Sequence, residues 1–179
     1  MINERAYEIS KTAEMIEYIA LAVIAIALPL VLKHPQLLVG SAVNFALILA
    51  AINMRGWPKM LPLIILPSVS ALAGGYLFGV FTAEQAYFIP FIWIANTLLV
   101  LLIKKLYVSQ KKNYLAAITA AGIMKAGFLF AAALALSALV EIPVVFLTAM
   151  GGLQLITVLI GGLAAWPVSA LIERNFINN

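Results

Sequence analysis

Four polar side chains lie inside long apolar stretches, and their types and positions suit them to binding chemistry. Lys125 lies near the middle of residues 116–140, an apolar run with no other charge. Asn44, Asn96 and Gln154 lie inside three other apolar runs. A lysine near the centre of a bilayer costs about 2.5–3.5 kcal/mol on insertion scales unless a cavity or a partner faces it. Since no Asp or Glu lies in mid-run, we expect an anionic or carbonyl-bearing partner for Lys125, or an uncharged amine.

Further polar and aromatic groups lie at the predicted outer ends of these runs, with Glu84 and Gln85 among them. Polar amides in the middle of a bundle, with aromatic groups above them, describe a pocket that opens to the outside. The predicted substrate-binding residues are Lys125, Asn96, Gln154, Trp93, Asn44, Glu141, His34 and Tyr87.

Each of these residues also has a plainer interpretation. Asn and Gln in membrane helices often bond a neighbouring helix, for about 0.6–2 kcal/mol. Aromatic residues at helix ends often form an interfacial belt. Side chains lean toward the N-terminus of their helix, which for Lys125 is the side away from Asn96 and Gln154. Lys125 is therefore expected to line the floor of the pocket or to reach another helix, and its contact with a ligand stays open.

Catalytic and metal-binding patterns are missing from the sequence. The chain has no cysteine and one histidine, which excludes thiolate nucleophiles, iron–sulfur clusters and sites built from several histidines. We find no HExxH motif, no intramembrane Asp pair, no Ser–His arrangement and no phosphate-cradling loop. We therefore expect no enzyme, no cofactor and no metal site, and any use of ATP requires a partner protein.

Composition sets the class of the elements that must position these residues. Of the 179 residues, 65% are hydrophobic and 10% are charged, whereas soluble domains carry about 25% charged residues. The chain is therefore predicted to be an all-α integral membrane protein with a single membrane domain, residues 1–179. A polar segment, residues 1–15, leads into the first helix, and residues 173–179 form a polar tail. The segment lacks the short apolar region and cleavage site of a signal peptide.

Six apolar runs are long enough to span a bilayer, which needs about 20 residues. They cover residues 16–32, 37–52, 60–81, 86–103, 116–140 and 144–172, and residues 104–113 between the fourth and fifth form a basic loop. Pro62, Pro67 and three glycines predict a bent or partly unwound third helix, and the Gly75-x-x-x-Gly79 spacing is typical of close helix packing.

Charge distribution predicts the orientation. The termini and the second and fourth loops carry nine Lys and Arg residues, and the other side carries only Lys33. By the positive-inside rule both termini are cytoplasmic. The formal charge of +4 is thus a topology signal, and no nucleic-acid partner is expected. The predicted location is the cell membrane, as a multi-pass protein of a prokaryotic inner or plasma membrane.

Small residues recur along the first segment. Ala6, Ala13, Ala20 and Ala27 are spaced by seven, and such a stripe is typical of a helix-packing face in lipid. We predict that it docks a partner, with chance recurrence of a common residue as the alternative.

The layout and four short stretches together resemble a known family. The stretches are GSAVN at residues 40–44, GYLFGVF at 75–81, PFIWIAN at 90–96 and QLITVLIGG at 154–162. With six spans and both termini inside, the chain resembles the substrate-binding S components of energy-coupling-factor (ECF) transporters. The resemblance implies capture of a vitamin or other micronutrient, together with a membrane coupling subunit and two cytoplasmic ATPases.

The same resemblance implies a ligand near the outer face, held by helices four to six and capped by the loops after helices one, three and five. One feature departs from the family. The family's first helix commonly carries Ala-x-x-x-Ala repeats that dock the coupling subunit, whereas here that spacing occurs in the second run, at Ala42, Ala46 and Ala50. Docking through the first helix is therefore in question.

Two other functions remain open from the sequence. A membrane anchor or assembly partner of a larger complex predicts a dry, well-filled bundle with no outer pocket. A small stand-alone carrier predicts flux without ATPases, although the lack of deep carboxylates counts against proton coupling.

Overall fold

The computed structural model describes residues 1–6, 10–32, 36–75 and 77–177, with the side chains of residues 173–177 excepted. Within these residues every regular element is helical. The elements are α1 (Lys11–Val31), α2 (Gln36–Asn53), α3 (Trp57–Gly74), the short 3-10 helix η1 (Gly79–Phe81), α4 (Thr82–Ile103), the π-helical turn η2 (Lys104–Ser109), α5 (Tyr114–Ser137), α6 (Val145–Met150) and α7 (Gly152–Ile177).

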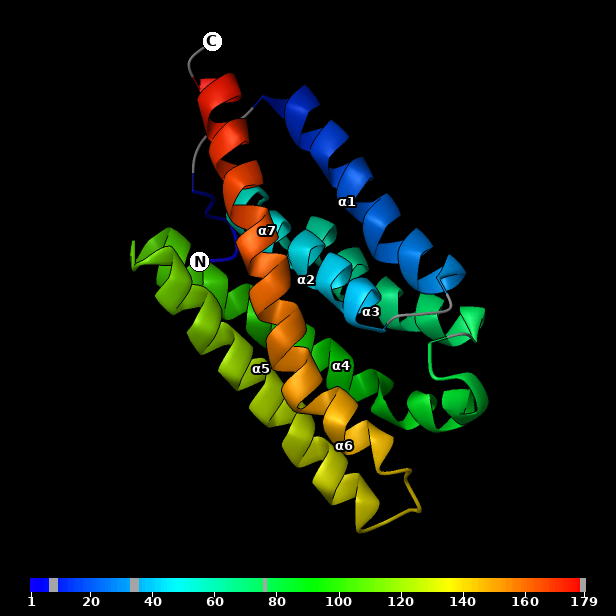
Figure 1. Ribbon diagram of the computed structural model, residues 1–179. Helices are drawn as coiled ribbons and strands as arrows, with labels where there is room; N and C mark the ends of the chain where they lie inside the picture. The colour runs from blue at the N-terminus through cyan, green and yellow to red at the C-terminus, as the bar shows by residue number, and fades with distance from the viewer. Residues whose placement is uncertain (7–9, 33–35, 76, 178–179) are drawn as a thin grey trace.

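Six helical segments of the described chain are long and apolar enough to cross a membrane, with α4 and η2 forming one span and α6 and α7 another. The prediction of an all-α, multi-pass membrane bundle is therefore confirmed (Figure 1). An even number of spans places the two termini on the same side, which we call the terminal side. The helices α2, α4 and α7 all begin on the opposite side.

Local sequence explains where several helices begin. The side chain of Ser10 accepts a hydrogen bond from the amide of Ala13 at the start of α1. Asn113 accepts one from the amide of Ala116 at the start of α5. Both residues satisfy backbone donors that a helix leaves without partners in its first turn.

The third apolar run ends earlier than predicted. Helix α3 runs through Pro62 and Pro67 and ends at Gly75, whose φ of 66° is left-handed. A left-handed glycine is a common helix terminator because it carries no side chain to clash. Gly79 also has a positive φ, and a side chain placed on either glycine would meet nothing within 4 Å. The close-packing interpretation of Gly75-x-x-x-Gly79 is therefore wrong, because the two glycines lie in a turn.

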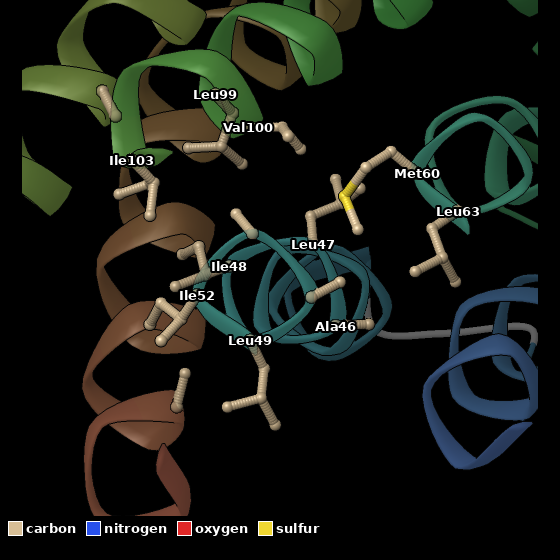
Figure 2. Close-up of a cluster of buried hydrophobic side chains, with 14 of the residues drawn as sticks. Ala46, Leu47, Ile48, Leu49, Ile52, Met60, Leu63, Leu99, Val100 and Ile103 are labelled. Carbon is tan, nitrogen blue, oxygen red and sulfur yellow. The ribbon is translucent and has the colours of Figure 1, made fainter. Parts of the chain in front are cut away.

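Helix α2 lies at the centre of the bundle and packs against α1, α3, α4 and α7. Figure 2 shows α2 nearly end-on, with Leu47 directed toward Met60 of α3 and Ile48 and Ile52 directed toward α7. All three of these α2 side chains are fully buried. Apolar burial on every side of α2 fixes its position in the bundle.

The contact between α2 and α7 is a backbone contact. A Cβ added to Gly161 would lie 2.6 Å from the backbone amide nitrogen of Phe45 and 2.6 Å from the carbonyl oxygen of Ser41. Small residues allow such close approach, which stabilises helix pairs in lipid through van der Waals contact. Asn44 of α2 and Thr157 of α7 lie beside this contact.

The predicted basic loop is partly helical. Residues 104–109 continue α4 as the π-helical turn η2, and Lys104 is fully buried. Its Nζ donates to the carbonyl oxygens of Glu4 and Met54, at 2.7 Å each. The prediction of a loop beginning at residue 104 is therefore wrong, because buried carbonyl acceptors hold this lysine inside the bundle.

The N-terminal segment packs against the same end of the bundle. The amide of Ala6 donates to the carbonyl oxygen of Ile52, and the amide of Gly56 donates to that of Ile2. Glu14 at the start of α1 pairs with Lys59 at 2.7 Å and with Arg5 at 3.6 Å. Residues 1–6 thereby close the terminal side of the bundle.

Candidate functional site

Lys125 is the centre of a polar cluster inside the bundle. Its side chain is 3% exposed, and its Nζ donates to Asn44 Oδ1 at 2.6 Å and to Asn96 Oδ1 at 2.7 Å. The three residues come from α5, α2 and α4. The expectation that the lysine leans away from Asn96 is therefore wrong, because a long flexible side chain reaches the nearest strong acceptors.

Second partners fix the orientation of the two asparagines. Asn44 donates through Nδ2 to Thr157 Oγ1 at 2.9 Å, and Thr157 donates to the carbonyl oxygen of Gln154 at 3.0 Å. Asn96 donates through Nδ2 to the carbonyl oxygen of Ile64 at 3.0 Å. Since both amide nitrogens are engaged, both amide oxygens must face the lysine. The cluster joins α2, α3, α4, α5 and α7 around one cation.

A cavity adjoins this cluster and extends toward the ends of α2, α4 and α7 on the side opposite the termini. Its empty volume is about 640 Å³, part of which is open to the surroundings. Lys125, Asn44, Asn96 and Gln154 all line it. Four of the predicted binding residues are therefore brought together at one cavity.

Helix α7 begins at this cavity because the last span is interrupted. The predicted continuous run of residues 144–172 is broken between α6 and α7, at Gly151. A Cβ on Gly151 would lie 2.9 Å from the ring of Phe130 and 3.0 Å from the carbonyl oxygen of Leu147. The break places Gln154 in the first turn of α7, where the sequence pattern suggested the interior of a helix.

Three more predicted binding residues, Trp93, Tyr87 and Glu141, are described by the structure and do not line the cavity. Trp93 contacts a residue of the cavity wall instead. Its Nε1 donates at 2.9 Å to the hydroxyl of Ser68, and Ser68 lines the cavity. Tyr87 is 53% exposed on α4. Glu141 is exposed in the connection between α5 and α6. His34 lies outside the described residues.

Other residues line the cavity without having been predicted as ligand contacts, among them Gln36, Ser68, Phe78 and Thr157. Gln85, placed by sequence among the outer polar groups, is 2% exposed, and its Oε1 has no hydrogen-bond partner among the described residues. A signal for Thr157 was present, because it lies three residues after Gln154 and so near the same helix face. No comparable signal marked Ser68 or Phe78.

Three alanines of the stripe, Ala13, Ala20 and Ala27, lie on α1 at a spacing of seven and so near one face, whereas Ala6 lies outside the helix. Ala6 precedes α1 and bonds α2 through its backbone. The residues of α1 that bury most fully against the bundle include Leu21, Ala25 and Pro29, at a spacing of four. Ala13 and Ala20 instead line a groove bounded by α1, α2 and α7, with an empty volume of about 840 Å³. In Figure 1 α1 stands apart from α7 on this side.

Glu17 also lines this groove. Its Oε1 accepts a hydrogen bond from Asn53 Nδ2, and its Oε2 is buried without a partner. Glu17 is the seventh residue of α1, about 9 Å from the helix start. It therefore lies near the terminal side, away from Lys125.

Comparisons with protein-family models, with curated proteins and with solved structures gave no match. The function is therefore inferred from the geometry of the site.

Proposed function

We propose that this chain is a membrane substrate-capture subunit that binds a small molecule in the cavity above Lys125. In this proposal it acts like the S component of an ECF-type importer of a vitamin or micronutrient. Energy then comes from partner ATPases through a membrane coupling subunit. One observation carries the proposal: a buried lysine, held by two asparagines on different helices, lines a cavity that is partly open on the side opposite the termini.

The chemistry of the cavity supports small-molecule binding. Ligand pockets are mostly apolar, with a few polar groups that fix the ligand's orientation. This cavity combines apolar side chains such as Val43 and Ile92 with Lys125 and three glutamines. Ionisable residues inside membrane proteins usually mark substrate or ion pathways. A lysine that only braced helices would need no cavity beside it.

Two other functions receive less support. A membrane anchor predicts a bundle filled with side chains, and a partly open cavity beside a buried lysine is not expected there. A proton-coupled carrier needs a carboxylate near its substrate, and no Asp or Glu is among the described residues that line the cavity. Substrate capture requires neither a bundle filled with side chains nor a buried carboxylate beside the cavity.

Native mass spectrometry of the protein released from lipid nanodiscs tests the proposal. We expect a bound small molecule in the wild-type protein and its loss in Val43→Trp, because an indole at this position fills the cavity. Val23→Trp is the matched control, since Val23 is 58% exposed on α1. It should retain the molecule.

Two results would contradict the proposal. One is a wild-type protein that carries no small molecule and takes none from a vitamin panel. The other is equal retention by Val43→Trp and Val23→Trp. Uptake into liposomes by the purified chain alone, without ATPases, would instead support a stand-alone carrier.

A further inference from the structure

Lys125 has no acidic partner among the described residues, so its charge is uncompensated when the amine is protonated. A protonated lysine offers three N–H donors, and the structure pairs two of them, with Asn44 and Asn96. Both partners are neutral amides. No acidic residue is among the described residues that line the cavity, and Lys125 forms no ion pair within the described part of the chain. One donor of a buried cation therefore remains for a group that enters the cavity.

The surrounding network favours an anion as that group. Asn44 and Asn96 are locked with their oxygens toward the lysine, because their nitrogens are donated to Thr157 and to the carbonyl oxygen of Ile64. Oxygens in this orientation favour the protonated amine. A buried cation is best stabilised by a partner of opposite charge that also accepts its hydrogen bond. A bound carboxylate meets both requirements.

A second unmet group lies at the other end of the cavity. Gln85 is 2% exposed and lines the cavity, and its Oε1 has no hydrogen-bond partner within the part of the chain that the structure describes. Gln85 precedes Asn96 by 11 residues on α4, which corresponds to about 16 Å along the helix axis. Since Lys125 Nζ lies 2.7 Å from Asn96 Oδ1, hydrogen bonds of about 3 Å at each end leave room for a ligand of about 10 Å. Apolar side chains, including Ile92 and Phe78, line the space between.

Resting on the proposed function, we propose that the ligand is a small organic monocarboxylate that bears an N–H or O–H group at its far end. Its carboxylate pairs with Lys125, its apolar middle contacts Ile92 and Phe78, and its distal donor bonds Gln85 Oε1. Dicarboxylates and cations do not fit the proposal, because the described residues that line the cavity include one basic side chain and no acidic one.

Three related probes test both ends of the ligand by isothermal titration of the detergent-solubilised protein. They are 3-(4-hydroxyphenyl)propanoate, its carboxamide, and 3-phenylpropanoate, which lacks the hydroxyl. We expect the acid to bind at least about tenfold more tightly than its amide, because charge-assisted hydrogen bonds are about twice as strong as neutral ones. Loss of the hydroxyl should weaken binding several-fold.

Variants assign these preferences to residues. Lys125→Met should abolish the preference for acid over amide, and Gln85→Leu should abolish only the advantage of the hydroxyl. Lys105→Met is the matched control, because Lys105 is an exposed lysine outside the cavity. Its probe affinities should equal those of the wild type. Where Lys125→Met does not fold, Lys125→Gln and the wild-type comparison of acid with amide give the same test.

The proposal is overturned if acid and amide bind the wild type equally, or if the acid preference persists in Lys125→Met. It is also overturned if neither acid binds at about 10 mM, ten times a weak Kd of about 1 mM. A neutral co-purified compound would overturn it while leaving the proposed function standing. Selective acid binding by the chain, in cells whose uptake of the acid does not depend on the chain, would leave the site standing and overturn the function.

Discussion

Two lysines are buried in the part of the chain that the structure describes, and the groups around them differ. Lys104 and Lys125 each donate two hydrogen bonds of 2.6–2.7 Å to oxygen acceptors. The acceptors of Lys104 are backbone carbonyls at the terminal side, and Lys104 lines neither of the two cavities described above. The acceptors of Lys125 are side-chain amides, and this lysine lines a cavity. Burial and pairing alone therefore do not mark a binding site, whereas an adjoining cavity distinguishes the two.

Both lysines act on α2. Lys125 bonds Asn44 within α2, and Lys104 bonds the carbonyl oxygen of Met54 directly after α2 ends. Backbone carbonyls are held in place by the fold, so they suit a permanent structural contact. Side-chain amides beside a cavity can share a cation with an incoming group. We infer that Lys104 holds the terminal end of the bundle while Lys125 belongs to the site.

Replacing Lys104 should have the largest effect on stability. Lys104→Met leaves the carbonyl oxygens of Glu4 and Met54 without donors, and unsatisfied buried groups cost about 1–3 kcal/mol each. We expect a loss of about 2–4 kcal/mol, after relief of the lysine's own desolvation. Thermal unfolding in detergent measures the loss. Hydrogen exchange should accelerate at the amides of Ala6 and Gly56, because their hydrogen bonds to the carbonyl oxygens of Ile52 and Ile2 attach the N-terminal segment to the bundle.

The control for this prediction is Lys105→Met, which removes an exposed lysine at the next position. It should change unfolding by no more than about 0.5 kcal/mol. Probe affinity should stay unchanged in folded Lys104→Met. A large loss of affinity there would show that the two lysines act as one unit, against the division of roles argued above.

The backbone contact between α2 and α7 gives the next largest effect. Gly161→Ala places a methyl group 2.6 Å from backbone atoms of α2, and such overpacking costs about 1–3 kcal/mol. Separation of the helices should also weaken the bond between Asn44 and Thr157, and with it probe binding. Gly127→Ala is the matched control, since nothing lies within 4 Å of its added Cβ.

Helix propensity should make Gly127→Ala neutral or stabilising by up to about 1 kcal/mol. Unfolding in detergent compares the two variants directly. Equal stability of Gly161→Ala and Gly127→Ala would contradict the close contact on which the position of Asn44 depends.

The sequence predicted the centre of the site better than its rim. Lys125, Asn44, Asn96 and Gln154 stood out because each interrupts an apolar run, and polar groups in lipid need partners. The outer binding residues were predicted from their proximity to helix ends. Proximity to a helix end does not show which way a side chain faces. Tyr87 and Gln85 lie two residues apart, about 200° around a helix. One is exposed and the other is buried against the cavity.

The predicted helix boundaries were wrong where backbone geometry, rather than hydropathy, sets the end of a helix. Residues 144–172 contain no charged residue and are mostly apolar, so hydropathy alone could not show the break at Gly151. The π-helical turn at residues 104–109 was likewise hidden, because a lysine pair normally indicates a solvated loop. Only the carbonyl acceptors contributed by residues 4 and 54, distant in the sequence, explain why Lys104 is buried.

A carboxylate placed beside Lys125 tests its proposed need for an external anion. Asn96→Asp keeps the shape of the side chain and supplies an internal counter-charge, although it loses the hydrogen bond to the carbonyl oxygen of Ile64. We expect the affinity for 3-(4-hydroxyphenyl)propanoate to fall about tenfold, corresponding to about 1.4 kcal/mol. The affinity for the carboxamide should change little. Titration calorimetry measures both, and an equal fall for acid and amide would indicate distortion of the cavity instead.

The smallest effect should come from Glu4, at the end that Lys104 braces. Hydrogen bonds from the N-terminal ammonium group and then from Ser109 lower the pKa of the Glu4 carboxyl below its ordinary value of 4.5. A carboxyl whose pKa is lower in the folded state stabilises above its unfolded pKa, and this stabilisation disappears as the pH falls through the folded value.

Glu4→Gln should therefore lower the melting temperature slightly at neutral pH and flatten its decline on acidification. Because Glu4 is exposed, solvent screens the interaction and the change should be small. Melting curves of wild type and variant, recorded from neutral pH to about pH 3, measure it. Identical dependence of the melting temperature on pH in the two proteins would contradict the ion pair between Glu4 and the N-terminal ammonium group. Since the backbone carbonyl of Glu4 remains for Lys104, probe binding should be the same in both, as expected if the terminal end serves only to brace the bundle.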